Sequence, residues 1–252
     1  MRRVDRPPLS EAAQDKLCEL TWEVAAAGHA AEKHRSKARK KRADDLWLHR
    51  TRNDAFREIR QTLAEMAPGN GLCMYCELSS GNDIEHFWPK EKYPGRAFTW
   101  DNYLWSCSPC NSNFKGSRFP RDDKGAPLLV NPTAEDPREH LEFSPTTGKL
   151  VGMTSKGEKT VETLGFDRRG RLDSMRRNAW NKLQELLVRF AAHSARGDGA
   201  RALLVQRVIC QEPFAAALGA LIRYAEDPRR RDQVHPECLE AIERFPEIRD
   251  WP

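Results

Sequence analysis

Several features that would assign the chain to a membrane, export or nucleotide-hydrolysis class are missing from its 252 residues. No run of about 18 apolar residues occurs, so we expect no transmembrane helix and no contact with a membrane. The opening stretch, MRRVDRPPLSEAAQ, lacks the apolar core of a secretory signal, and a cytoplasmic protein is therefore expected. No Gly-x-x-x-x-Gly-Lys-Ser/Thr loop is present, so ATP-driven sensing would have to lie in another protein.

Internal repeats and low-complexity linkers are also absent, so the sequence marks no sharp domain boundary. The composition, 39% apolar and 31% charged, is that of a polar globular protein long enough to bury a core without disulfides. A net charge of +5 is a modest indication of a polyanionic partner. We divide the chain into a helical region with a basic segment over 1–70, a core over 71–125, and short strands followed by helices over 126–252.

The N-terminal region is predicted to contain two helices and a basic segment. Residues 9–35 are rich in Ala, Glu and Leu and favour a helix. The segment 33–42 carries seven Lys or Arg among ten positions, which is typical either of a solvated face or of a contact with phosphates. A second helix is expected over 44–66, because apolar residues recur there on one face: Phe56, Ile59, Leu63 and Met66.

Downstream of the core, short apolar runs separated by turn residues predict a β-hairpin around residues 146–148. From about Leu172 the pattern becomes helical, and further helices are expected over 199–226, interrupted near Pro213, and over 235–245. One apolar stripe at helical spacing is expected to lie in the core: Trp180, Leu183, Leu187 and Phe190.

Two Cys-x-x-Cys pairs bracket 30 residues in the middle of the chain. In a reducing compartment, four such thiolates can form a closed tetrahedral zinc site: Cys73, Cys76, Cys107 and Cys110. A [4Fe–4S] cluster and a redox dithiol are the alternatives. The remaining cysteines are isolated, and we expect them to be small core residues: Cys18, Cys210 and Cys238.

Between and beside the cysteine pairs lie residues suited to phosphodiester hydrolysis, which needs a base, a cation and an orienting group. His86 can act as the base because an imidazole titrates near neutral pH. Glu85 and Asn111 offer oxygen ligands for Mg²⁺ or Mn²⁺, with Asp83 in reserve. Asn102 can fix the His86 ring directly or through the backbone. Since neighbouring residues on a flat strand face opposite sides, Glu85 and His86 can share a site only at a strand end or bulge.

These residues resemble the HNH nuclease family. The Glu85-His86 pair resembles the family's first motif, Asn102 its central Asn, and Asn111 its last position. The resemblance implies an α+β fold: a ββα-metal core with a four-cysteine zinc site, framed by mainly α-helical regions. It also implies His86 as the general base, Glu85 and Asn111 as ligands of the catalytic ion, and Asn102 as the orienting residue. A Lys usually follows three positions after the last Asn, whereas Lys115 follows four positions after it here.

Over about residues 70–180, the chain resembles a smaller group of proteins within this family. The segments IEHFWPK, CNSNFKG and SKGEKTVETLGFDR are similar to PtuB-type nuclease subunits of Septu and related retron anti-phage systems. This similarity implies a DNA substrate and a partner ATPase of the PtuA type. The terminal helices, over about 9–66 and 172–250, are the surfaces expected to bind that partner, unless they only complete one globular fold.

Basic side chains near the motif are candidates for positioning the nucleic-acid backbone without reading bases. Those beside the core are Lys90, Lys92, Arg96, Lys115, Arg118 and Arg121. A second cluster, for which surface solubility is the alternative, comprises Arg168, Arg169, Arg171, Arg176 and Arg177. Two other functions stay open: a stand-alone, restriction-like HNH nuclease that needs no partner, and a non-catalytic zinc module that binds nucleic acid or protein.

Overall fold

The computed structural model describes residues 1–31, 34–214 and 216–251. The described chain is mostly helical, with two separate two-stranded sheets. The longer helices are α1 (Glu11–Ala30), α2 (Arg35–Arg50), α3 (Asp54–Met66), α5 (Ser155–Thr163), α6 (Gly170–Ala195), α7 (Gly199–Gln211), α8 (Ala216–Glu226) and α9 (Pro236–Arg244). The short α4 covers Pro68–Gly71, and the strands are β1 (Asp83–His86), β2 (Tyr103–Ser106), β3 (Leu141–Phe143) and β4 (Leu150–Gly152).

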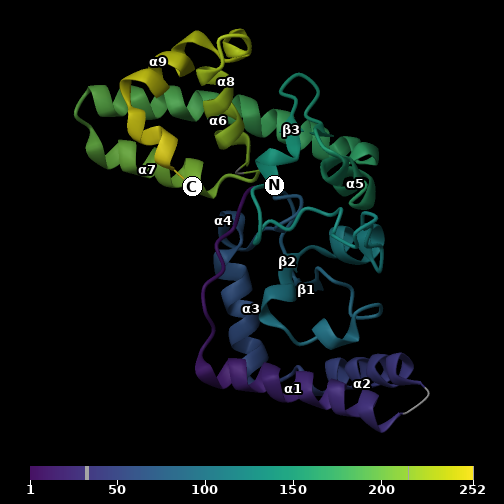
Figure 1. Cartoon of the computed structure of the whole chain (residues 1–252). Helices are drawn as coiled ribbons and strands as arrows, with labels where there is room; N and C mark the ends of the chain where they lie inside the picture. Colours follow the sequence, from purple (N-terminus) through teal and green to yellow (C-terminus); the bar gives the residue numbers. More distant parts are fainter. Residues whose placement is uncertain (32–33, 215, 252) are drawn as a thin grey trace.

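The molecule is elongated, with helices at both ends and the central hairpin between them (Figure 1). Helices α1 and α2 form one end, and α6 to α9 form the other. The first ten residues run back along α3 to the middle of the molecule. Arg6 holds this segment against the hairpin, because its guanidinium donates to the carbonyl oxygens of Trp100 (2.8 Å) and Tyr103 (2.7 Å).

The N-terminal region contains three long helices where two were predicted. Helix α1 ends at Ala30, and the basic segment is itself helical as part of α2; Lys33 of that segment lies outside the described residues. The helix predicted over 44–66 is divided, because the Asn53 side chain accepts a hydrogen bond from Phe56 N and starts α3. The predicted apolar face is confirmed for Phe56, Ile59 and Leu63, which are fully buried.

Strands β1 and β2 pair antiparallel, with His86 opposite Tyr103 and Asp83 opposite Ser106. All four residues of β2 are buried. The segment that follows is a seven-residue π-helix, Pro109–Lys115. The order of two strands and a helical segment matches part of the prediction, although the helical piece is short and of π type. This π-helix begins between Cys107 and Cys110, and it brings Asn111 and Lys115 back towards β1.

The C-terminal half follows the sequence pattern closely. Strands β3 and β4 form the predicted hairpin, and the apolar stripe of α6 is buried. The interruption predicted near Pro213 is present, since α7 ends at Gln211 and α8 begins at Ala216. Phe214 N donates to Glu77 O at 2.7 Å. Cys18 is exposed, so its assignment to the core was wrong. None of the helices in the described ranges is both long and apolar enough to cross a bilayer.

The turn of the β3–β4 hairpin depends on Gly148. Its φ of +76° lies in the left-handed region, and a Cβ atom there would lie 1.9 Å from the carbonyl oxygen of Asp173 in α6. We expect Gly148→Ala to lower the free energy of unfolding by about 2 kcal/mol or more, because strain and a backbone clash add. Gly95→Ala is the control, since beyond its own local backbone no atom of the described chain lies within 4 Å of the place its Cβ would take. Thermal melts with equal losses for both variants would contradict this explanation.

Candidate metal centre and active site

Four cysteines from two turns of the chain meet at one buried point. Their sulfur atoms all lie within 4.8 Å of one another: Cys73, Cys76, Cys107 and Cys110. Cys73 and Cys76 sit on a turn closed by a hydrogen bond from Glu77 N to Cys73 O, 2.8 Å. The second pair bridges the end of β2 and the π-helix. The sequence prediction that the four side chains converge is therefore confirmed.

The geometry of this cluster fits a tetrahedral metal ion. A zinc ion with Zn–S bonds of about 2.3 Å separates its ligands by about 3.8 Å. The sulfur atoms of Cys76 and Cys107 lie 3.9 Å apart. The cluster is all sulfur and buried, as in closed structural zinc sites, and could hold a metal such as zinc.

Arg169 supplies positive charge beside the cysteines. Its Nη1 lies 3.1 Å from Cys110 Sγ, and its guanidinium stacks over the ring of Phe114. Four thiolates around one divalent ion carry a net charge of −2, which a neighbouring guanidinium offsets. Two members of the second basic cluster fit neither a solvating surface nor a contact with the nucleic-acid backbone, because Arg169 contacts the cysteines and Arg176 is fully buried.

His86 lies at the end of β1 with its ring held by the backbone. Nε2 is 3.0 Å from the carbonyl oxygen of Ala97. A carbonyl oxygen can only accept, so Nε2 carries the proton and Nδ1 carries the lone pair. The hydroxyl of Tyr103 donates to the same carbonyl at 2.8 Å. Burial lowers the pKa of His86 to about 3, so the ring is neutral at neutral pH and resists protonation while it stays covered.

Asn102 positions the loop that holds this carbonyl. Its side chain accepts from Trp88 N (2.7 Å) and donates to Trp88 O (3.0 Å) and to Arg96 O (2.8 Å). Arg96 directly precedes Ala97, whose carbonyl bonds the imidazole. Of the two routes predicted for Asn102, the backbone route is the one present. The side chain is 1% exposed, so its hydrogen-bonding capacity is used inside the protein.

Glu85 is buried and paired with Lys115. The Lys115 ammonium contacts Glu85 Oε1 and donates to His86 O at 2.8 Å. Burial raises the pKa of Glu85, while the adjacent Lys115 acts in the opposite direction. Lys115 is 1% exposed, which conflicts with its predicted role as a contact to DNA. Lys115 instead joins the π-helix to β1 from inside.

Asp83 and Asn111 form a second polar group beside the cysteines. Asp83 Oδ2 accepts from Ser108 Oγ at 3.0 Å and from Asn111 Nδ2 at 3.3 Å. All three residues are partly exposed. The structure thus brings together Asn111, the last position of the motif, and Asp83, the reserve metal ligand, next to the second cysteine pair. These partly exposed oxygen atoms suit a hard divalent cation better than the buried carboxylate of Glu85.

His86 and the acidic residues Asp83 and Glu85 face different sides of β1. Glu85 turns towards the π-helix, whereas His86 faces the loop and the helix α2. The indole of Trp47, on α2, packs against the imidazole with ring centroids 4.4 Å apart. His86 is 8% exposed as a result. The structure therefore does not bring His86 and the Asp83 group into one open site, and α2 covers the imidazole.

Some of the side chains predicted to contact the nucleic-acid backbone are exposed, whereas others are already paired within the protein. Arg118 and Arg121 are exposed beside the core. Lys90 is ion-paired with Asp44 of α2, which fastens that helix to the loop after β1. The roles of Trp47 and Arg169 were not predicted from the sequence. Arg169 follows the LGFDR segment, which had carried the family resemblance, whereas nothing in the sequence marked Trp47.

Comparison with known proteins gives two related sequences. The chain is 36% identical to the Septu protein PtuB of Bacillus mycoides (strain KBAB4) over 130 residues, which cover 40% of this chain and 44% of that protein. It is 35% identical to the Septu protein PtuB of Bacillus thuringiensis over 119 residues, which cover 45% of this chain and 43% of that protein. The chain thus matches less than half the length of these relatives. No protein-family model matches it.

If the cysteines hold zinc, losing one ligand should destabilise the whole hairpin. We expect Cys107→Ser to lose bound metal and to lower the free energy of unfolding by several kcal/mol, because metal binding contributes directly to folding. Metal analysis should give one zinc per wild-type chain, with a much lower melting temperature for the variant. Cys18→Ser is the control, since Cys18 is exposed. A variant that melts like the wild type would show that the cysteines hold no structural ion.

The tautomer and protonation of His86 can be observed directly. We expect its ring to keep the Nε2–H tautomer and to take up no proton between pH 7 and about pH 4, because burial disfavours the imidazolium. Nitrogen-15 NMR of the histidine side chains, assigned with His86→Gln, measures both properties. Proton uptake by His86 above pH 5 would show that the ring is open to water.

Proposed function

We propose that the chain is a metal-dependent HNH endonuclease that hydrolyses DNA phosphodiester bonds. The observation that carries the proposal is the state of His86: a neutral imidazole, with Nε2–H bound to the carbonyl of Ala97 and the lone pair left on Nδ1. This tautomer makes Nδ1 the proton acceptor, and the ring becomes an effective base only when it is uncovered, because burial holds its pKa far below neutral pH. The hairpin that carries it is closed by the cysteine cluster, as expected for the zinc-stapled branch of the family.

Asp83 and Asn111 are the residues that would hold a divalent ion, with Glu85 as a further ligand once Lys115 releases it. A bound Mg²⁺ or Mn²⁺ supplies neutralising charge for the phosphate and the leaving oxygen. The chain's own residues perform the other tasks. In an open state, His86 at the end of β1 accepts the proton of a water that attacks a phosphate lying across that strand end, next to the ion held on the Glu85 side. Asn102 fixes the carbonyl loop, and the exposed Arg118 and Arg121 position the backbone of the substrate.

The conformation of the structure is then a closed state of the nuclease. Trp47 covers the imidazole, and the ion pair between Lys90 and Asp44 fastens α2 over it. Displacement of α2 opens the ring to water and substrate. A restrained nuclease of this kind suits a defence protein, because uncontrolled cleavage would damage the host's own DNA.

The role in the cell follows from the relatives. We propose that the chain acts in a Septu-type anti-phage system, in the cytoplasm, together with an ATPase subunit of the PtuA type. The absence of a Walker-type loop in the sequence is consistent with sensing by another subunit. The exposed apolar side chains of α7 offer a surface for that subunit: Leu203, Leu204 and Val208. A stand-alone, restriction-like nuclease is the alternative within the same class.

A non-catalytic zinc module is the second candidate function. The burial of His86 and the ion pair between Glu85 and Lys115 favour it, because neither group meets solvent in this conformation. Such a module would bind metal at the cysteines and hold nucleic acid or protein without cleaving it. It leaves the pairing of Asp83 with Asn111 and the poised tautomer of His86 without a purpose.

Plasmid nicking separates these candidates. With Mg²⁺ or Mn²⁺, alone and with the neighbouring ATPase subunit, we expect His86→Ala to lower the cleavage rate by about 10²–10⁴, the usual loss on removing a general base. Asp83→Asn and Asn111→Ala should shift the metal dependence to higher concentrations. His29→Ala serves as the control, since His29 is exposed on α1.

Each other outcome is informative. Equal nicking by the wild type and His86→Ala would remove His86 from the mechanism. No cleavage under any of these conditions, with zinc still bound, would favour the non-catalytic module. Full activity of the purified chain without any partner would favour the stand-alone nuclease.

A further inference from the structure

A basic groove lies between the first turns of α2 and the loop after β1. Its volume is about 410 Å³, and the loop contributes the short turn Pro94–Arg96, which packs against α2. Four cationic side chains line the groove, two from each wall: Arg35, Arg39, Lys92 and Arg96. No acidic residue lines it in the part of the chain that the structure describes.

These four charges have no ion-pair partner within the described ranges. The acidic residues of α1 and α2 that form ion pairs use other cations: Asp44 contacts Lys40 and Lys90, and Glu23 contacts Arg42. Like charges that face each other across a contact repel, and an anion between them offsets that repulsion. The groove is therefore suited to a negatively charged ligand from outside the chain.

The cationic groups are accessible to such a ligand. Arg35, Lys92 and Arg96 are exposed, whereas Arg39 is half-buried, with its stem packed on α1. The guanidinium of Arg96 lies over the ring of Trp88, 4.6 Å from the ring centroid. Stacking uses the flat face of a guanidinium and leaves its N–H groups free to donate to phosphate oxygens.

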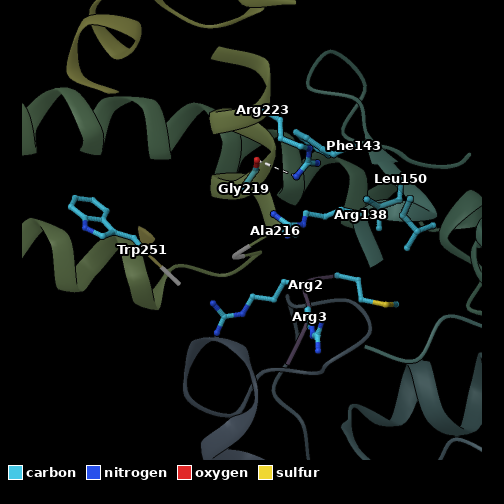
Figure 2. A pocket seen from close by; sticks show the side chains of 11 residues that line it. Arg2, Arg3, Arg138, Phe143, Leu150, Ala216, Gly219, Arg223 and Trp251 are labelled. Atoms are coloured by element: carbon cyan, nitrogen blue, oxygen red, sulfur yellow. Dashed lines mark hydrogen bonds between the residues drawn. The ribbon is translucent and has the colours of Figure 1, made fainter. Parts of the chain in front are cut away.

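A second cavity lined by arginines, between the N-terminal segment, the β3–β4 hairpin and α8, is arranged differently (Figure 2). There Arg2 and Arg3 extend away from Arg223, and Arg138 is paired with Asp136 at 2.6 Å. Those side chains do not point into one common space, so they cannot hold one phosphate together.

The groove continues the face of α2 that covers His86. Arg35, Arg39 and Leu46 share one side of the helix, because they are four and seven residues apart. Leu46 is buried, and Trp47 beside it packs on the imidazole. Arg39 and Trp47 are about 12 Å apart along the helix axis. Phosphates of one DNA strand are about 3.4 Å apart along the duplex, so this separation corresponds to about three or four base pairs.

We propose that this groove binds the phosphate backbone of DNA and leads it towards His86. The identity of the ligand rests on the proposed nuclease function. Exposed cations hold phosphates without reading bases, so no sequence preference arises here. Both walls are in place while Trp47 covers the imidazole, so the closed protein can already hold DNA. Binding of the strand and uncovering of the base are then separate steps.

Gly95 gives the sharpest test, because it lines the groove and is exposed. Beyond its own local backbone, no described atom lies within 4 Å of the place its Cβ would take, so a side chain fits there. Gly95→Asp places a negative charge in the groove, and Gly95→Ala is the neutral control. Fluorescence anisotropy of the full chain with a labelled duplex in EDTA measures binding without cleavage. We expect Gly95→Asp to weaken binding by about tenfold or more and Gly95→Ala to leave it unchanged.

Removing one cation from each wall is an independent test. Arg35→Gln and Lys92→Gln should each weaken binding about fivefold and lower the slope of log Kd against log salt concentration by about 1, because each lost phosphate contact releases fewer counter-ions. Lys41→Gln is the control. It removes an exposed charge two residues after Arg39, on the other side of α2, and should change neither quantity.

Three results would overturn the proposal: equal binding by Gly95→Asp and Gly95→Ala, a loss with Lys41→Gln as large as with the two groove variants, or binding of pyrophosphate as tight as that of the duplex. Nicking tests the nuclease function separately. A chain that binds DNA through the groove and never nicks it supports the groove and removes the endonuclease. A chain that nicks DNA while Gly95→Asp binds normally removes the groove and supports the endonuclease.

Discussion

The convergence of four cysteine sulfurs is the constraint on which the rest of the core depends. One pair precedes β1 and the other follows β2, so the cluster ties together both ends of a hairpin whose strands are only four residues long. Two such strands do not form a stable unit alone. The first pair leads into the turn at Glu77, whose carbonyl accepts from Phe214 N and so connects the cluster to the C-terminal helices. The second pair starts the π-helix that carries Lys115 into the interior.

Strand alternation then decides what the hairpin can do. Glu85 and His86 are neighbours in sequence but face opposite sides of β1, because successive side chains on a strand alternate. Lys115 neutralises Glu85, and Trp47 covers His86. The hydrogen bond from His86 to Ala97 leaves a usable lone pair on a ring that solvent hardly reaches. If the proposed nuclease function is correct, the covered imidazole can act only after α2 has moved.

Local signals predicted much of this architecture. The cysteine spacing predicted the cluster, the turn residues predicted the β3–β4 hairpin, and the apolar stripes predicted the buried faces of α3 and α6. The sequence did not reveal contacts between distant segments. Lys115 resembled a surface lysine, because nothing nearby in sequence shows that a π-helical turn directs it onto Glu85. Trp47 lies 39 positions before His86, so no local pattern could place it over the imidazole. The break between α2 and α3 was not predicted, because the helical pattern continues on both sides of Asn53 and hides the helix start that its side chain caps.

The central claim is that the four cysteines hold one tetrahedral zinc ion that organises the hairpin. X-ray absorption at the zinc edge of the purified chain tests it most directly. A closed site of this kind predicts four sulfur neighbours at about 2.3 Å and no nitrogen or oxygen bound to the ion. Nitrogen or oxygen ligands, an iron–sulfur spectrum, or a chain that is folded without metal would contradict it.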